Sequence, residues 1–235
     1  MKRKTIGLFA HVDAGKTTFA EQLLYHTNSI RARGRVDHKD AFLDSHDIER
    51  ARGITVFADQ AAMSYKGDAY YLIDTPGHVD FSPEMERAIL TMDYAVVIVS
   101  AVEGVQGHTE TVWQLLRQHR VPTFFFINKT DRTGADAERV FEEIRRQLTD
   151  DAVEVAESFA GGVVREPLRE AMAERDEALL EAFMEGREDQ AFWLDSLRAD
   201  GSSRPVVPLR ERLGAAGHRR CRISRAAAPA DGIRL

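Results

Sequence analysis

The sequence has a single cysteine, Cys221, among its 235 residues. One thiol cannot form an internal disulfide, which excludes the class of disulfide-stapled secreted domains and suits the cytoplasm. Long hydrophobic runs are also lacking. No apolar stretch approaches the roughly 20 residues needed to cross a bilayer, and no signal-type segment follows Met1. We therefore expect a cytoplasmic protein without a membrane partner.

Acidic residues outnumber basic ones in the body of the chain. From Arg204 onward eight arginines stand against Glu211 and Asp231, so this tail carries +6 and the remainder −12 of the net −6. The body shows no basic stripe, and we expect no direct binding to DNA. Apolar residues make up 43% of the chain, which is ordinary for a globular protein, and the length allows one large domain or two small ones.

What is present, at the start, is an apolar strand over Lys4–Ala10 that ends in a small, polar turn. Such a turn before a helix predicts backbone N–H groups wrapped around phosphates, with the helix N-terminus aimed at them. Lys16 is expected to reach the β and γ oxygens, and Thr17 to offer its hydroxyl to Mg²⁺. Ala10 stands where the usual pattern has glycine. The candidate phosphate-binding residues of this loop are Ala10, His11, Val12, Asp13, Ala14, Gly15, Lys16, Thr17 and Thr18.

Two further motifs fit the same chemistry. Thr55 ends Arg-Gly-Ile-Thr and is placed to complete Mg²⁺ coordination, although it could as easily begin a strand. Asp74 begins Asp-Thr-Pro-Gly-His and would hold a metal-bound water, while the N–H of Gly77 would meet the γ-phosphate. The candidate metal ligands are therefore Thr17, Thr55 and Asp74.

The fourth motif decides which base is bound. It consists of Asn128, Lys129, Thr130 and Asp131. A carboxylate at Asp131 can accept hydrogen bonds from the N1–H and N2–H₂ edge of guanine, an edge that adenine lacks. A site built on such bonds rejects the analogue without them by large factors. The residues Asn128, Lys129 and Asp131 thus predict GTP and GDP as ligands rather than ATP.

Strands and helices are expected to alternate along the chain. Apolar runs predict strands over 4–10, 56–64, 69–73, 95–99 and 123–127, and helical spacing predicts helices over about 16–27, 82–91, 109–119 and 136–148. The Lys-Gly-Asp turn at 66–68 indicates an antiparallel hairpin, whereas the unalternating run 95–99 is typical of a buried parallel strand. We predict an α/β fold with a doubly wound sheet, mostly parallel with one antiparallel edge strand, plus a helical insertion.

Taken together, the four motifs resemble those of the translational GTPases, and among them elongation factor G and, more closely, the tetracycline ribosomal-protection proteins. Gly104-Val105-Gln106 and Thr111-Val112-Trp113 fit the same pattern. The resemblance implies a Ras-like P-loop GTPase fold, hydrolysis of GTP with Mg²⁺, and a ribosome partner. It also implies that alanine at position 10, in place of the usual glycine, is normal for the family. Antibiotic protection and translocation stay open as alternative roles.

The resemblance also implies the catalytic residues, which are His78, Asp13 and Lys16. His78 would act as the catalytic histidine on the ribosome, at the position where other Ras-like enzymes carry a water-orienting glutamine. Asp13 would help to position a monovalent ion or that histidine. A lone histidine beside a turn is more commonly a plain surface residue, but the place of His78 directly after Gly77 favours the catalytic interpretation.

The domain organisation follows from the same comparison. We expect a GTP-binding domain over residues 1–209, with an acidic helical insertion at about 151–199 that forms a subdomain or packs on the main sheet. The family continues into domains that contact the ribosome, and we expect these to be missing here. Two alternatives therefore remain beside a translation GTPase: a truncated product that only binds nucleotide, and a self-standing regulatory GTPase.

The segment 210–235 lacks any helical or strand period and contains arginine but no lysine. It could be a solvated basic arm. We favour an aberrant tail read out of frame, because shifting suitable codons for Leu209–Leu213 by one base yields Phe-Gly-Ser-Ala-Leu, the guanine-contacting loop that the family would have here. We expect this tail to be disordered.

Overall fold

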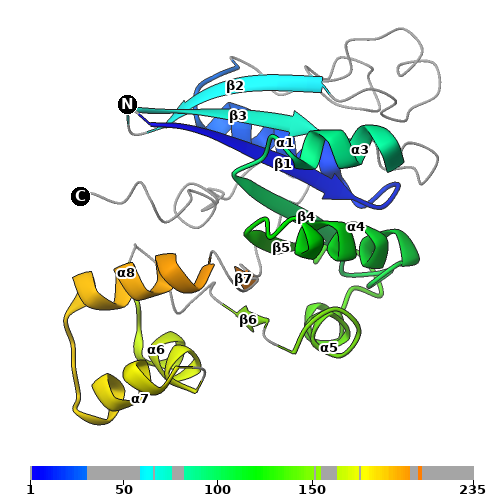
Figure 1. Cartoon of the computed structure of the whole chain (residues 1–235). Coiled ribbons are helices and arrows are strands. Elements are labelled where there is room, and N and C mark those ends of the chain that lie inside the picture. Colours follow the sequence, from blue (N-terminus) through cyan, green and yellow to red (C-terminus); the bar gives the residue numbers. More distant parts are fainter. Residues whose placement is uncertain are drawn as a thin grey trace, which may run out of the picture.

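The computed structural model describes residues 2–30, 59–65, 67–75, 82–150, 152–154, 163–174, 176–201 and 206–207. The strands in these ranges are β1 (Arg3–Ala10), β2 (Asp59–Tyr65), β3 (Asp68–Asp74), β4 (Tyr94–Ser100), β5 (Thr123–Asn128), β6 (Val153–Glu154) and β7 (Val206–Val207). They form one sheet of seven strands in the order β2-β3-β1-β4-β5-β7-β6 (Figure 1). Only β2 runs antiparallel to its neighbour, β3, and the other pairings are parallel. The predicted α/β class and the antiparallel edge strand are thus confirmed.

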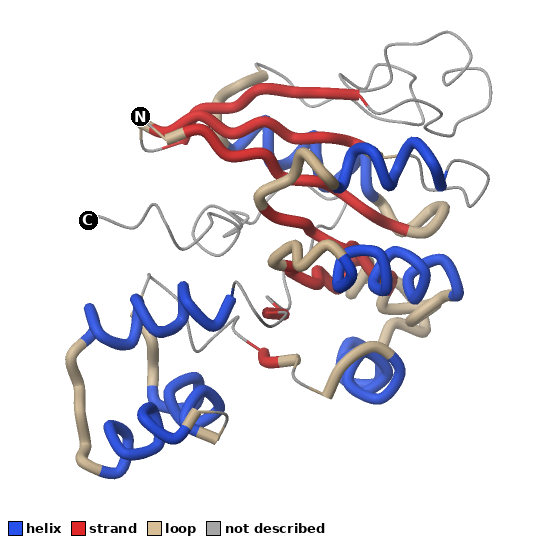
Figure 2. The backbone as a smooth tube through the Cα atoms, in the orientation of Figure 1, coloured by secondary structure: helices blue, strands red, loops and turns tan. Residues whose placement is uncertain are grey.

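The described helices are α1 (Lys16–His26), α3 (Ser82–Ile89), α4 (Gly107–Gln118), α5 (Ala137–Gln147), α6 (Glu166–Ala173), α7 (Glu177–Met184) and α8 (Gln190–Gly201). The first four lie within two or three residues of their predicted bounds. α5 begins at a side-chain cap, because the carboxylate of Asp136 accepts a hydrogen bond of 3.0 Å from the N–H of Arg139. The strands and helices alternate through the main body, as the tube in Figure 2 shows.

Alternation along the strands builds a separate core on each face of the sheet. In β4, Val97 and Val99 pack with α3, α4 and α5, whereas Val96 and Ile98 pack with α1 on the opposite face. All four side chains are buried, which is why this strand shows no polar alternation in the sequence. Helices on both faces define the doubly wound architecture.

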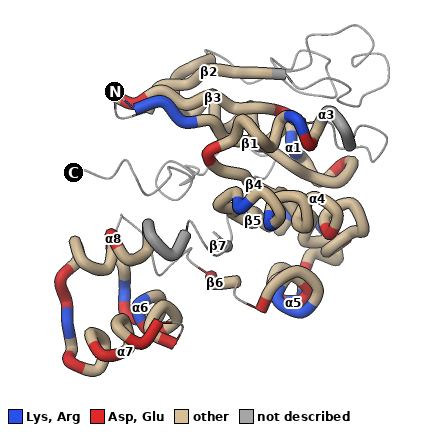
Figure 3. Tube along the Cα trace, viewed as in Figure 1, with Lys and Arg blue, Asp and Glu red and all other residues tan. Residues whose placement is uncertain are grey.

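Helices α6, α7 and α8 pack mainly on one another. Their shared core contains the fully buried Trp193 together with Leu168 and Met172, and it meets the sheet at Phe124. Figure 1 accordingly shows these helices beside the sheet, beyond β6 and β7. Figure 3 marks acidic residues, together with a basic one, along the segment that joins α7 to α8. Leu180 of α7 lies outside this core and is 45% exposed.

One strand of this region was not expected from the sequence. The strand β6 lengthens the sheet through pairing with β7, although it is only two residues long. β7 is described over Val206–Val207, and the tail predicted to be disordered lies outside the described residues. No helix in the part of the chain that the structure describes is long and apolar enough to cross a membrane.

The topology brings the motif-bearing strand ends to one edge. β1 lies between β3 and β4, and β4 pairs with β5, all in parallel. The carboxyl ends of these strands therefore meet at the same edge of the sheet. The chain order reverses around β1, and in open α/β sheets ligands bind in the crevice at such a switch point.

Candidate functional site

The predicted phosphate loop connects β1 to α1. Ala10 is the last residue of β1, and the N–H of Ala14 donates a 3.2 Å hydrogen bond to the carbonyl of His11, closing a tight turn. Asp13 in this turn has a φ of 63°, in the left-handed region that non-glycine residues seldom adopt. Helix α1 then begins at Lys16. The first N–H groups of a helix lack intrahelical partners, so the backbone here is suited to an anion.

Side chains along the loop differ in exposure. The structure buries Ala14 and Lys16, buries most of His11 and part of Thr17, and exposes Val12, Asp13 and Thr18. Lys16 forms an ion pair with Asp74, whose side chain is fully buried at the end of β3. Two residues predicted to serve one site, 58 positions apart, are thus in direct contact. Removing one partner of a buried ion pair is strongly destabilising.

Gly15 is required by two features of the structure at once. Its φ is +93°, and a Cβ at this position would collide with the side-chain amide of Asn128. The Nδ2 of Asn128 donates a 2.9 Å hydrogen bond to the carbonyl of Ala14, across 114 residues of sequence. Asn128 ends β5 and is buried. The predicted guanine-binding motif is therefore bonded directly to the predicted phosphate loop.

The remaining residues of the guanine motif follow Asn128. Lys129 has a φ of 60° and is half-buried, whereas the carboxylate of Asp131 is exposed. The exposed oxygens of this carboxylate are open to a ligand. This arrangement suits an acceptor for a pair of N–H donors on a ligand.

Thr75 anchors the beginning of the Asp-Thr-Pro-Gly motif. Its hydroxyl donates a 2.6 Å hydrogen bond to the carbonyl of Leu8 in β1, and its backbone N–H approaches the same carbonyl at 3.3 Å. Thr75 is 1% exposed. Three predicted site residues, Thr55, Gly77 and His78, lie outside the described residues.

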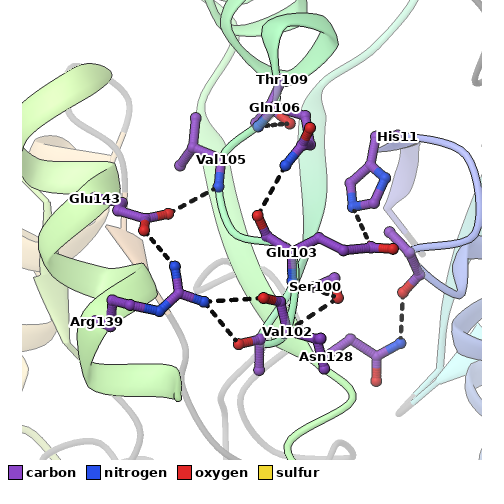
Figure 4. Close-up of polar contacts among 12 residues, drawn as sticks. His11, Ser100, Val102, Glu103, Val105, Gln106, Thr109, Asn128, Arg139 and Glu143 are labelled. Atoms are coloured by element: carbon purple, nitrogen blue, oxygen red, sulfur yellow. Dashed lines mark hydrogen bonds and ion pairs between the residues drawn. The ribbon is translucent and has the colours of Figure 1, made fainter. Parts of the chain in front are cut away.

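A set of polar residues that the sequence reasoning missed surrounds the loop between β4 and α4 (Figure 4). Arg139 and Glu143 of α5 form an ion pair and hold this loop, while Glu103 of the loop reaches His11. The sequence signal for the ion pair was the spacing of four residues between Arg139 and Glu143 on one helix. Nothing local to Glu103 indicates its contact.

The sequence model of the family described as "Elongation factor Tu GTP binding domain" matches residues 1–209. The chain belongs to this family. As a member of the elongation factor Tu GTP-binding domain family, it is the GTP-binding domain of a translational GTPase.

Curated relatives of this family member include both resistance proteins and a translation factor. The chain is 37% identical to "Tetracycline resistance protein TetP" of Clostridium perfringens over 218 residues, which cover 86% of the chain and 33% of that protein. It is 41% identical to "Tetracycline resistance protein TetM" of Streptomyces lividans, covering 88% and 34% respectively. Identity to "Elongation factor G 2" of Syntrophomonas wolfei is 36%, covering 88% and 35%. The chain thus spans about a third of the length of these relatives.

A solved structure agrees with this family assignment. A crystal structure of a Thermus thermophilus protein superposes with a TM-score of 0.78 at 27% identity. The match covers 88% of this chain and 37% of that one. The resemblance to translational GTPases that the motifs predicted is confirmed.

Proposed function

We propose that this domain binds GTP with Mg²⁺ and hydrolyses it to GDP and phosphate, as the G domain of a ribosome-associated factor of the ribosomal-protection or elongation factor G type. The observation that supports this most directly is the hydrogen bond from Asn128 to the carbonyl of Ala14. It joins the base-selecting motif to the phosphate loop, so the two lie side by side, as binding of one nucleotide by both requires. The family membership supports the same activity.

Each residue has a stated role in this proposal. Lys16 neutralises the β- and γ-phosphate charge, and the loop N–H groups from Ala10 to Thr18 bind the phosphate oxygens. Asp131 accepts hydrogen bonds from the N1–H and N2–H₂ of guanine, while Asn128 and Lys129 position the loop around the base. His78 orients the attacking water, and Asp13 supports that histidine or a monovalent ion. Gly77 senses the γ-phosphate through its N–H.

The donor chemistry fits magnesium. The hydroxyl of Thr17 and the carboxylate of Asp74 are hard oxygen donors, the type that Mg²⁺ prefers, and a few protein ligands suffice when phosphate oxygens complete the shell. The contact between Asp74 and Lys16 brings this carboxylate to the start of α1, where Thr17 follows. We propose Thr17, Thr55 and Asp74 as the protein groups that hold the ion. When bound, Mg²⁺ would neutralise charge developing on the β- and γ-phosphate oxygens.

The test is GTP turnover by the chain with and without ribosomes, next to nucleotide binding measured separately. Lys16→Ala is expected to abolish GTP binding, because the phosphate charge loses its counter-charge. His78→Ala is expected to leave GTP affinity nearly unchanged and to lower turnover. His26→Ala, at the opposite end of α1 from the phosphate loop, is the matched histidine control and should change neither.

The outcomes separate the alternatives. Binding and turnover that ribosomes stimulate would support a translation GTPase. Binding without turnover, with or without ribosomes, would indicate a nucleotide-binding product only. Turnover that ribosomes leave unchanged would indicate a regulatory GTPase instead. A large loss of GTP affinity in His78→Ala would contradict the water-orienting role and assign His78 to binding.

A further inference from the structure

Glu103 lies beside the first residue of the phosphate loop. The side chain of His11 is nine-tenths buried, and its Nε2 lies 3.2 Å from Oε2 of Glu103. The two groups are not aligned for a hydrogen bond, and Nε2 has no other hydrogen-bond partner among the residues that the structure describes. The contact therefore rests on proximity between a carboxylate and a ring nitrogen, as Figure 4 shows.

The backbone of Glu103 is held on both sides. Its N–H and that of Val102 each approach the hydroxyl oxygen of the buried Ser100 at 3.3 Å. Its carbonyl accepts a 2.8 Å hydrogen bond from the side-chain amide of Gln106. The Cα of Glu103 is therefore fixed relative to β4, and only the side-chain torsions remain to carry its carboxylate to His11.

Helix α5 holds the rest of this loop. The guanidinium of Arg139 donates to the carbonyls of Val102 at 3.0 Å and Ala101 at 3.3 Å, and it forms an ion pair with Glu143. Glu143 in turn accepts a 3.1 Å hydrogen bond from the N–H of Val105. Gly104, with φ +73°, allows this approach, because a Cβ there would collide with the Glu143 carboxylate.

We propose that Glu103 is a positioning residue for the phosphate loop, which it holds through His11. The carbonyl of His11 accepts the N–H of Ala14, and the carbonyl of Ala14 accepts Asn128, so an anchored His11 restrains the whole turn. A turn that is already ordered loses less conformational entropy when it binds a ligand. This inference rests on the phosphate-binding role proposed above for the loop. In this proposal Glu103 acts through His11 rather than by contact with phosphate, and it slows the release of the nucleotide.

The experiment measures the release of a fluorescent GDP analogue from the full chain. Glu103→Ala is expected to release it about two- to fivefold faster, the range that a partly exposed polar contact supports. Glu103→Gln keeps the side-chain length but removes the charge, and should fall between Glu103→Ala and the wild type. Glu110→Ala, an exposed carboxylate one turn into α4, is the matched control and should release the analogue at the wild-type rate.

A double-mutant cycle identifies the route. His11→Ala combined with Glu103→Ala should release the analogue no faster than His11→Ala alone, because both changes break one contact. Glu103 is 43% exposed, so Glu103→Ala should leave the melting temperature of the nucleotide-free chain unchanged. A merely structural role would lower that temperature.

Several results would overturn the inference. These are an unchanged release rate in Glu103→Ala, an equal acceleration in Glu110→Ala, additive effects in the cycle, or acceleration that tracks a loss of melting temperature. If the wild-type chain itself failed to retain the GDP analogue, the proposed function would fall together with this inference. If the wild type retained the GDP analogue and Glu103→Ala released it at the same rate, this inference would be wrong and the proposed function would stand.

Discussion

Replacing Gly15 by alanine tests whether the phosphate loop and the guanine motif share one rigid junction. Two costs are expected. The φ of +93° places an L-residue in the left-handed region, which costs about 1–2 kcal/mol. The new Cβ also displaces Asn128, so the buried carbonyl of Ala14 loses its partner, at a cost of about 1–3 kcal/mol. The free energy of unfolding should therefore fall by about 2–5 kcal/mol, a large share of a typical 5–15 kcal/mol.

Gly67 supplies the matched control. Its φ is +86°, and a Cβ there would meet nothing within 4 Å. Gly67→Ala thus carries the same left-handed strain without any collision. Because the substitution is chemically the same, its effect on the unfolded chain is the same in both variants. The difference between the two losses isolates the Asn128 contribution, expected at about 1–3 kcal/mol.

Urea unfolding followed by tryptophan fluorescence measures both variants. The chain is kept free of nucleotide, since a lost ligand would otherwise lower the apparent stability by mass action. Adding Asn128→Ala to Gly15→Ala should cost less than the sum of the single changes, because both act on one contact. Equal losses for Gly15→Ala and Gly67→Ala would refute the reasoning, since the collision would then have no energetic consequence.

Three further outcomes are expected. Asp131→Asn should shift binding from guanine toward xanthine nucleotides, whose 2-position oxygen requires a donor; equal affinity of the wild type for ATP and GTP would contradict the base assignment. Trp193→Ala should lower the free energy of unfolding by about 3–5 kcal/mol, because the ring is fully buried and its Nε1 donates a 2.6 Å hydrogen bond to the backbone carbonyl of Arg187. Leu180→Ala, at an exposed position, should cost far less. Thr75→Val should cost about 1–3 kcal/mol in urea unfolding, with Thr75→Ser close to the wild type if the hydroxyl bond to Leu8 is what matters.

Much of the fold was determined by local patterns in the sequence. The apolar run in β4 has no polar alternation because both faces of that strand are covered. The sequence alone therefore predicted that this strand is buried. The hairpin of β2 and β3 followed from the turn that contains Gly67. The motifs also placed their residues at strand ends, which parallel pairing brings to one edge. The two-residue β6 was missed, because so short a strand has no period of its own.

The contacts that organise the candidate site were decided only by the tertiary structure. Lys16 and Asp74 were each assigned to phosphate or metal, yet they also pair with each other, because the parallel pairing of β1 with β3 brings the end of β3 beside the start of α1. The need for glycine at position 15 depends on Asn128, 114 residues from Ala14, as well as on φ. Glu103 carries no motif of its own, and it becomes significant because α5 fixes its loop against β4, beside His11. Sequence patterns show on which face of its own helix or strand a residue lies, whereas contacts between helices and strands depend on how those elements pack.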